Sequence, residues 1–188
     1  ISYVCIGGFL AISWTDTFQA GLMIFALLLT PIMTYLAIDG NAAQFTVLLE
    51  TARPQAMHIV SELSTVAILS SLAWGLGYFG QPHILVRFMA ADSVKTIPAA
   101  RRIGMTWMIL CLGGAVGAGF IAIAYFQQHP ELAAVVSQNP ETVFMELTKI
   151  LFNPWIAGII LAAILAAVMS TLSCQLLVCS TTLTEDMY

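Results

Sequence analysis

The sequence predicts an all-α membrane protein, a polytopic helix bundle in which one helix is broken. Its 188 residues are 60% hydrophobic and only 9% charged, and the mean hydropathy is +0.92. Soluble domains carry about 25% charged residues, so the composition alone indicates a membrane protein. The net charge of −4 comes from few groups and says little about partners, but no basic patch is present that could hold nucleic acid. The partner that the composition indicates is the lipid bilayer.

The first third of the chain holds one partial and one complete span. Residues 1–13 are too short to cross a bilayer, which takes about 20 residues, so we expect the end of a helix that begins upstream. The polar run 14–17 is predicted as a tight turn in which Thr15 or Asp16 caps the next helix. An ion-pathway role for Asp16 stays open beside capping. Residues 17–38 form the first complete span.

Three further spans follow, which gives four complete spans and one partial span. The polar segment 39–60 is predicted as an outer connection and leads to the span at 61–88. The loop at 89–102 is the most basic connection, so the positive-inside rule places it in the cytoplasm. The last two spans are 103–126 and 155–182. The first of these carries small residues at a spacing typical of helix packing: Gly113, Gly117 and Gly119.

The outer segment between the last two spans, residues 128–154, is predicted to contain a helix of its own. Asn139 suits its cap and Pro140 its first position. One face of this helix is apolar and comprises Val143, Phe144, Leu147, Ile150 and Leu151. We expect this helix to lie on the membrane surface or to cap the bundle.

The run at 61–88 is long enough to cross a bilayer but is weak in its middle. Gly75, Gly77 and Gly80 disfavour a helix, and Pro82 removes an amide donor. In lipid, backbone groups freed in this way must be buried in protein or line a wet cavity, as in the binding sites of transporters. The same glycines match a dinucleotide fingerprint, but their flanks are apolar runs of helical length rather than a βαβ unit, which speaks against a nucleotide site.

The break also carries candidate substrate-binding residues. Trp74 and Tyr78 lie four residues apart, on one helical face, with Gln81 and Pro82 just beyond. Aromatic residues also gather at membrane interfaces, but these two stand near the middle of a span. We expect Tyr78 to form a hydrogen bond with a small solute and Trp74 to pack against it, with Gln81 as a further polar contact.

The last span carries a candidate sodium site. Ala167, Ser170 and Thr171 stand at i, i+3 and i+4, so they share a helical face. Two hydroxyls and an approachable backbone carbonyl supply neutral oxygen ligands for Na⁺. Membrane Ser and Thr side chains also commonly bond to their own helix, so this alternative stays open.

Other polar residues are less informative. Arg87 at the end of the broken span suits a headgroup contact, with a coupling or gating role as the alternative. His83 is expected to be structural. The cysteines show no metal or redox spacing and are predicted as buried free thiols. No catalytic motif is present, so we do not expect an enzyme.

Five stretches resemble the sodium/solute symporter family, and in particular its proline-carrying bacterial members: GGFLAISWTDTFQA, WGLGYFGQPHILVRFMAAD, ARRIGMTWMILC, LFNPWIAGIILAAILAAVMSTLSCQLLVC and TTLTEDMY. The resemblance implies the inverted-repeat fold shared with the leucine transporter. Residues 1–38 would then end the first repeat, 39–60 would be the outer connection, and 61–188 would belong to the second repeat, all within one membrane domain.

The resemblance also assigns site residues. The family's sodium site matches Ala167, Ser170 and Thr171, and its proline pocket matches Trp74, Tyr78 and Pro82. Asp16 and Arg87 stand where the family has residues tied to sodium coupling. The family's unwound second span, which supplies the remaining ligands, would lie upstream of Ile1.

The function implied by the resemblance is sodium-coupled import of L-proline by alternating access, in the bacterial inner membrane. Sodium is the coupling ion, and no other cofactor is expected. The alternatives are the same fold with another solute (a sugar, pantothenate or another amino acid), a channel, or a solute sensor that does not transport. The oligomeric state is left open.

Overall fold

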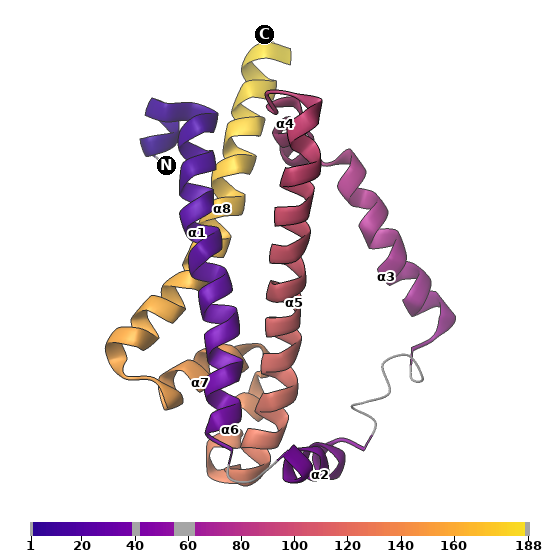
Figure 1. Cartoon of the computed structure of the whole chain (residues 1–188), viewed down its shortest axis with the longest axis vertical. Coiled ribbons are helices and arrows are strands. Elements are labelled where there is room, and N and C mark those ends of the chain that lie inside the picture. The colour runs from indigo at the N-terminus through magenta and orange to yellow at the C-terminus, as the bar shows by residue number, and fades with distance from the viewer. Residues whose placement is uncertain (1, 39–41, 55–62, 187–188) are drawn as a thin grey trace. The chain divides into compact units, whose positions relative to one another are not determined.

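The computed structural model describes residues 2–38, 42–54 and 63–186, and within these ranges it is helical with no strand (Figure 1). This confirms the all-α prediction. The α-helices are α1 (Ser2–Leu36), α2 (Ala42–Ala52), α3 (Thr65–Gly77), α4 (Pro82–Met89), α5 (Ile97–Gln128), α6 (Pro130–Gln138), α7 (Val143–Leu151) and α8 (Pro154–Thr181). Short 3₁₀ turns occupy Tyr78–Gly80, Val94–Thr96 and Pro140–Thr142, and a π turn occupies Thr182–Asp186.

Three helices of the described residues are long and apolar enough to cross a membrane: Tyr3–Leu36, Val94–Gln128 and Pro154–Glu185. The prediction of a partial span at 1–13 separate from a complete span at 17–38 is wrong, because both segments lie in α1, which departs from helical geometry at Gly8 rather than at 14–17. The broken run at 61–88 contains the shorter apolar helix Thr65–Gly80, and its crossing of the membrane stays a prediction.

The polar run 14–17 lies inside α1 and forms no turn, so the predicted capping role of Thr15 or Asp16 is wrong. The Thr15 hydroxyl donates to the carbonyl oxygen of Ala11 at 3.0 Å. A hydroxyl that donates a hydrogen bond to a carbonyl oxygen of the preceding turn is compatible with an uninterrupted helix at this position. The helix bends earlier, at Gly8, whose φ of 51° and ψ of −140° suit a residue without a Cβ atom.

The connection between α4 and α5 is shorter than predicted. Because α4 ends at Met89 and α5 begins at Ile97, Arg101 and Arg102 of the predicted loop 89–102 belong to the first turns of α5. The cytoplasmic side of this connection stays a prediction.

The chain divides into two compact units. Unit 1 comprises Ile1–Thr17, His58–Thr106 and Val168–Tyr188, and unit 2 comprises Phe18–Met57 and Trp107–Ala167. The predicted connection 39–60 supplies α2 to unit 2, while its residues 39–41 and 55–60 lie outside the described ranges. The predicted division into repeats is not decided by these units and stays a prediction.

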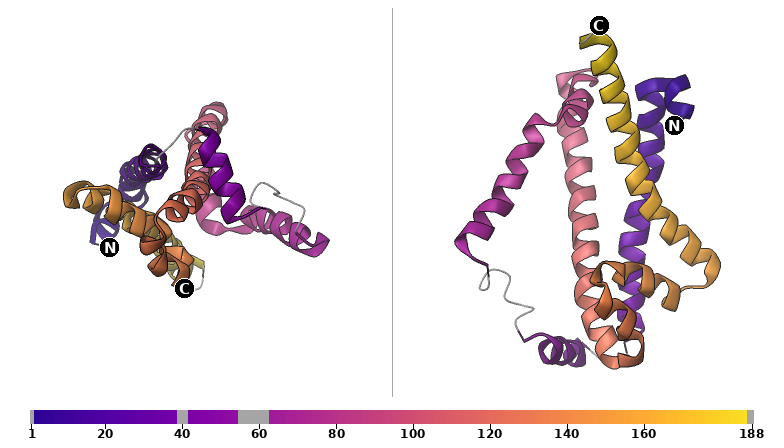
Figure 2. Two further views of the ribbon diagram at one scale, coloured as in Figure 1. Left: turned by 90° about the horizontal axis from the view of Figure 1, so that it is seen from below. Right: turned by 180° about the vertical axis from the view of Figure 1, so that it is seen from behind.

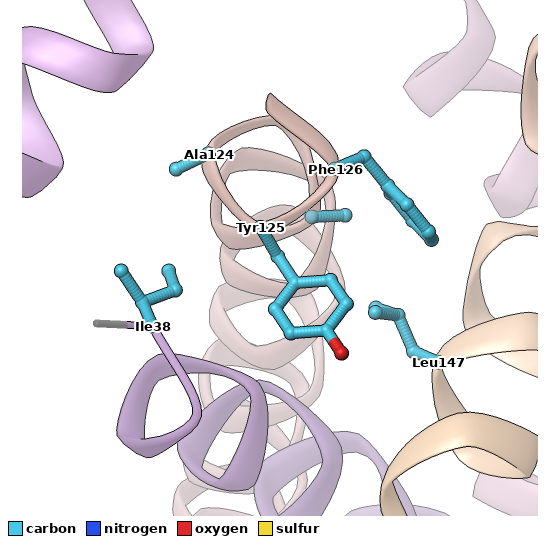
Figure 3. Packing of buried hydrophobic residues seen from close by; sticks show 6 residues of the cluster. Ile38, Ala124, Tyr125, Phe126 and Leu147 are labelled. Atoms are coloured by element: carbon cyan, nitrogen blue, oxygen red, sulfur yellow. The ribbon is translucent and has the colours of Figure 1, made fainter. Parts of the chain in front are cut away.

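Unit 2 packs around Tyr125, near the end of α5 (Figure 3). The ring of Tyr125 lies between Ile38, which follows α1, and Leu147 of α7. Tyr125 is 5% exposed and Leu147 is fully buried. Side chains of α2 and α6 complete this cluster: Phe45, Leu48, Leu132, Ala133 and Val136. The short helices thus cap the ends of the long ones by apolar burial.

The predicted helix start at Asn139 and Pro140 is confirmed. Oδ1 of Asn139 accepts a hydrogen bond from the backbone N–H of Glu141 at 3.2 Å, and Pro140 begins the 3₁₀ turn that leads into α7. Of the predicted apolar face, Leu147 is buried, Val143, Phe144 and Leu151 are half-buried, and Ile150 is 37% exposed. The preceding helix, α6, was not distinguished in the sequence.

A close approach of α1 and α5 also holds unit 2. A Cβ atom on Gly114 would collide with the carbonyl oxygen of Leu27. In a regular helix the carbonyl oxygen of Leu27 would accept a hydrogen bond from the N–H of residue 31, but residue 31 is a proline and has no N–H. The carbonyl oxygen of Leu27 therefore stays free of this bond and lies close to Gly114 of α5. The predicted packing glycines Gly113, Gly117 and Gly119 do not make this contact, because a Cβ on any of them would meet open space, and their packing against a neighbour stays a prediction.

Unit 1 is held differently. Neither α3 nor α4 has a buried residue. The buried side chains of the unit lie on α1 and α8, at Ile12, Ser173 and Cys174. The free thiols Cys5 and Cys179 are exposed, so the prediction that all four cysteines are buried is right only for Cys111 and Cys174.

Candidate functional site

The break in the span at 61–88 lies where the sequence placed it. The α-helical geometry of α3 ends at Gly77, a 3₁₀ turn follows at Tyr78–Gly80, and Gln81 is extended with φ −84° and ψ 116°. Pro82 then takes the first position of α4, where its missing N–H costs nothing. Figure 2 shows the resulting change of direction between α3 and α4. The turn closes with hydrogen bonds of its own: the N–H of Gln81 donates to the carbonyl oxygen of Tyr78 at 3.4 Å, and the carbonyl oxygen of Gln81 accepts from the N–H of Ile84 at 3.0 Å.

The two aromatic candidates meet on the face that leads into this break. The rings of Trp74 and Tyr78 are 4.9 Å apart between centroids and stand edge to face at 79°. Such pairs attract through the ring quadrupoles. Trp74 is 70% exposed and Tyr78 is 41% exposed. The two rings thus contact each other but are not covered by other side chains. Gln81 is half-buried and Pro82 is exposed.

The predicted sodium residues lie on α8, which is helical from Pro154 to Thr181. The helical spacing of Ala167, Ser170 and Thr171 puts them on one side of it. Ala167 and Ser170 are half-buried, and Thr171 is exposed. Their role in binding sodium stays a prediction.

The two coupling candidates form an ion pair. Nη2 of Arg87 donates to Oδ2 of Asp16 at 2.6 Å, and the side chains are 50% and 17% exposed, respectively. The pair joins α4, directly after the break, to α1. The second carboxylate oxygen, Oδ1 of Asp16, is buried without a hydrogen-bond partner among the described residues.

Two further contacts tie α8 to its neighbours in unit 1. The Cys174 thiol faces the carbonyl oxygen of His83 at 3.8 Å, which joins α8 to the first turn of α4. The hydroxyl oxygens of Tyr3 and Ser173 are 2.6 Å apart, which joins α8 to the start of α1. Neither Tyr3 nor Ser173 is among the predicted site residues, because nothing in their spacing indicates that they pair.

Two cavities of unit 2 contain none of the predicted site residues. One of about 410 Å³ lies along α1 and α5 and is lined by apolar residues that include Pro31 and Gly114. Another of about 490 Å³ lies against α5 and α6, with Arg53 at its wall. The candidate residues for solute and coupling all lie in unit 1, as do Ser170 and Thr171 of the sodium candidates, whereas Ala167 is the last residue of unit 2.

Within the described residues, three long apolar helices and one helix broken at glycines and a proline define the class: a polytopic helical membrane protein with an interrupted helix. The model of the sodium:solute symporter family matches residues 1–188. The chain therefore belongs to the sodium:solute symporter family.

Individual relatives agree with the family match. The sodium/proline symporter of Escherichia coli (strain K12) is 62% identical over 188 residues, which is 100% of this chain and 37% of the relative. The sodium/proline symporter of Haemophilus influenzae is 59% identical over 192 residues, covering 100% of this chain and 38% of the relative. The high-affinity proline transporter PutP of Bacillus subtilis (strain 168) is 50% identical, again over 100% of this chain and 39% of the relative.

The chain thus spans less than two fifths of the length of these relatives, 37% to 39%. No solved structure matches the chain. The relatives' names describe transporters, which agrees with the expectation that the chain is not part of an enzyme.

Proposed function

We propose that this chain forms part of a sodium-coupled transporter that imports L-proline by alternating access across the bacterial inner membrane. The observation that carries the proposal is 62% identity, along the whole chain, to a sodium/proline symporter. The helix broken at Gln81, with Trp74 and Tyr78 on the approach to it, supports the proposal because it supplies backbone and aromatic groups to a small solute.

The site residues take the following roles. The pyrrolidine ring of proline packs on Trp74, Tyr78 forms a hydrogen bond with the solute, and Gln81 and Pro82 form the wall of the break. Sodium is coordinated by the backbone oxygen of Ala167 and the hydroxyls of Ser170 and Thr171. Neutral oxygen ligands hold a monovalent ion weakly enough to release it, which a transport cycle requires.

Coupling follows from the difference between access states. Sodium drives solute uptake only if it binds the outward-facing state more tightly than the inward-facing one. Since α4 connects the break to both Asp16 on α1 and Cys174 on α8, movement of α4 is a route by which the two sites influence each other. The Asp16–Arg87 pair is proposed as part of this coupling.

The test uses the full-length protein that contains this chain, purified and reconstituted in proteoliposomes. Uptake of radiolabelled L-proline is measured with an inward sodium gradient and with potassium in its place. We expect concentrative uptake only with sodium, and competition by unlabelled proline. Competition by a sugar, pantothenate or another amino acid in place of proline would assign a different solute. Uptake that stops when the proline concentrations inside and outside are equal would indicate a channel. Saturable binding without uptake would indicate a sensor.

A further inference from the structure

The start of α1 makes a polar contact with α8 that the proposed function does not yet use. The hydroxyl oxygens of Tyr3 and Ser173 are 2.6 Å apart, a short distance for two neutral hydroxyls. Ser173 is 1% exposed. Tyr3 stands before the bend at Gly8, so the backbone geometry of this glycine directs the first turn of α1, including Tyr3.

Ser173 differs from most hydroxyl side chains of the long helices. Ser13, Thr15, Thr34 and Thr181 donate to carbonyl oxygens of their own helix. Ser173 instead pairs with the hydroxyl of Tyr3, on another helix. A buried hydroxyl that loses its partner pays a desolvation penalty, so this contact favours one orientation of α8.

The position of this contact on α8 links it to the proposed sodium ligands. Ser173 follows Ser170 by three residues, and Cys174 follows Thr171 by three, so each lies one turn beyond a proposed ligand and on nearly the same face. Cys174 contacts the carbonyl oxygen of His83 at 3.8 Å. The turn of α8 after the ligands is therefore tied to α1 through Tyr3 and to α4 through His83.

We propose that Tyr3 is a positioning residue for sodium: its hydroxyl, bound to Ser173, fixes the rotation of α8 so that the oxygens of Ser170 and Thr171 stand in register for the ion. This inference rests on the proposed function and identifies a residue that serves the same site without touching the ion. A small cation needs its oxygens at fixed distances, so a supporting contact one turn away changes its affinity.

The test measures proline uptake against sodium concentration in the full-length protein, reconstituted as above. Tyr3→Phe keeps the ring and removes the hydroxyl, and Ser173→Ala removes its partner. Each is expected to raise the half-saturating sodium concentration about three- to tenfold, the effect of one lost hydrogen bond. The half-saturating proline concentration at saturating sodium and the maximal rate should stay unchanged. The double variant should be no worse than the stronger single variant, because both remove the same contact.

Two matched variants sharpen the test. Tyr35→Phe removes a hydroxyl from the same helix, α1, and should leave the sodium dependence unchanged. Gly8→Ala forces a side chain onto a left-handed φ of 51° and should reproduce the Tyr3→Phe shift, because it redirects the first turn of α1.

Three results would overturn the inference: an unchanged sodium half-saturation in both Tyr3→Phe and Ser173→Ala, additive effects in the double variant, or a fall in maximal rate alone. Each of these can occur while wild-type uptake remains sodium-dependent, so the proposed function would survive. Sodium-independent uptake by the wild-type protein would instead contradict both the proposed function and this inference.

Discussion

The two units of the chain are held by contacts of different kinds. Unit 2 packs by apolar burial, around Tyr125 and Leu147 and in a second cluster of Ala26, Ile160 and Ala163. In unit 1 the contacts between α1, α4 and α8 include an ion pair, a hydroxyl pair and a thiol-to-carbonyl contact. Its helices α3 and α4 bury no residue.

This difference is compatible with the proposed transport function. Apolar packing is strong and leaves few alternative arrangements. Each polar contact contributes little net stability and can be exchanged for another, provided that every buried polar group finds a new partner. A segment that changes position during a transport cycle is better held by the second kind, and nearly all the candidate site residues lie in unit 1.

The largest effect on stability is expected from the apolar packing of unit 2. Leu147→Ala empties a fully buried position in unit 2 and should destabilise the protein by about 2–5 kcal/mol. Leu69→Ala is the matched change on α3, where the side chain is 60% exposed, and should stay within about 0.5 kcal/mol. Thermal unfolding of the full-length protein in detergent measures both. Equal losses would show that α3 is packed as firmly as α7.

The next effect concerns function rather than stability. Thr171→Val keeps the shape of the side chain and removes a proposed sodium ligand, so the sodium requirement of proline uptake should rise about ten- to hundredfold. The unfolding temperature should not change, since Thr171 is exposed on α8. An unaltered sodium dependence would remove Thr171 from the site.

A smaller loss is expected where α1 and α5 approach each other. Gly114→Ala places a Cβ atom against the carbonyl oxygen of Leu27, and overpacking of this kind costs about 1–3 kcal/mol. Gly113→Ala, one residue earlier, adds a methyl group in open space and should be neutral or slightly stabilising. Unfolding temperatures of the two variants compare them directly. A stable Gly114→Ala variant would argue against the close approach.

The smallest effect on stability is expected at the ion pair. Arg87 is half exposed, so loss of its bond to Asp16 should change stability by less than about 1 kcal/mol. Its effect on uptake should be larger if the pair takes part in coupling. Arg87→Gln should slow sodium-dependent uptake, and the charge exchange Asp16→Arg with Arg87→Asp should restore part of it. An exchange that restores nothing would show that the two residues act independently.

Much of the fold follows from local chemistry in the sequence. The long apolar helices, the cap at Asn139 and the break before Pro82 all depend on residues close together in the chain. The same holds for the Trp74–Tyr78 pair, since residues four apart on a helix are neighbours.

Features that depend on a distant partner could not be predicted. The polar run 14–17 is a different case: its hydroxyls donate to carbonyl oxygens of their own helix, so local chemistry fits a helix as well as a turn. Several glycines of α5 have similar spacing, but only the position of Leu27 selects Gly114 as the contact. The pairing of Tyr3 with Ser173 likewise joins residues at opposite ends of the chain.

The most direct test of the central claim is the binding of L-proline to the purified full-length protein, with and without sodium. The wild-type protein should bind proline much more tightly in sodium. Trp74→Ala, a change at a 70% exposed position, should abolish this binding while leaving the unfolding temperature unchanged. Unaltered sodium-dependent binding in the Trp74→Ala variant would contradict the claim that the broken helix holds the solute.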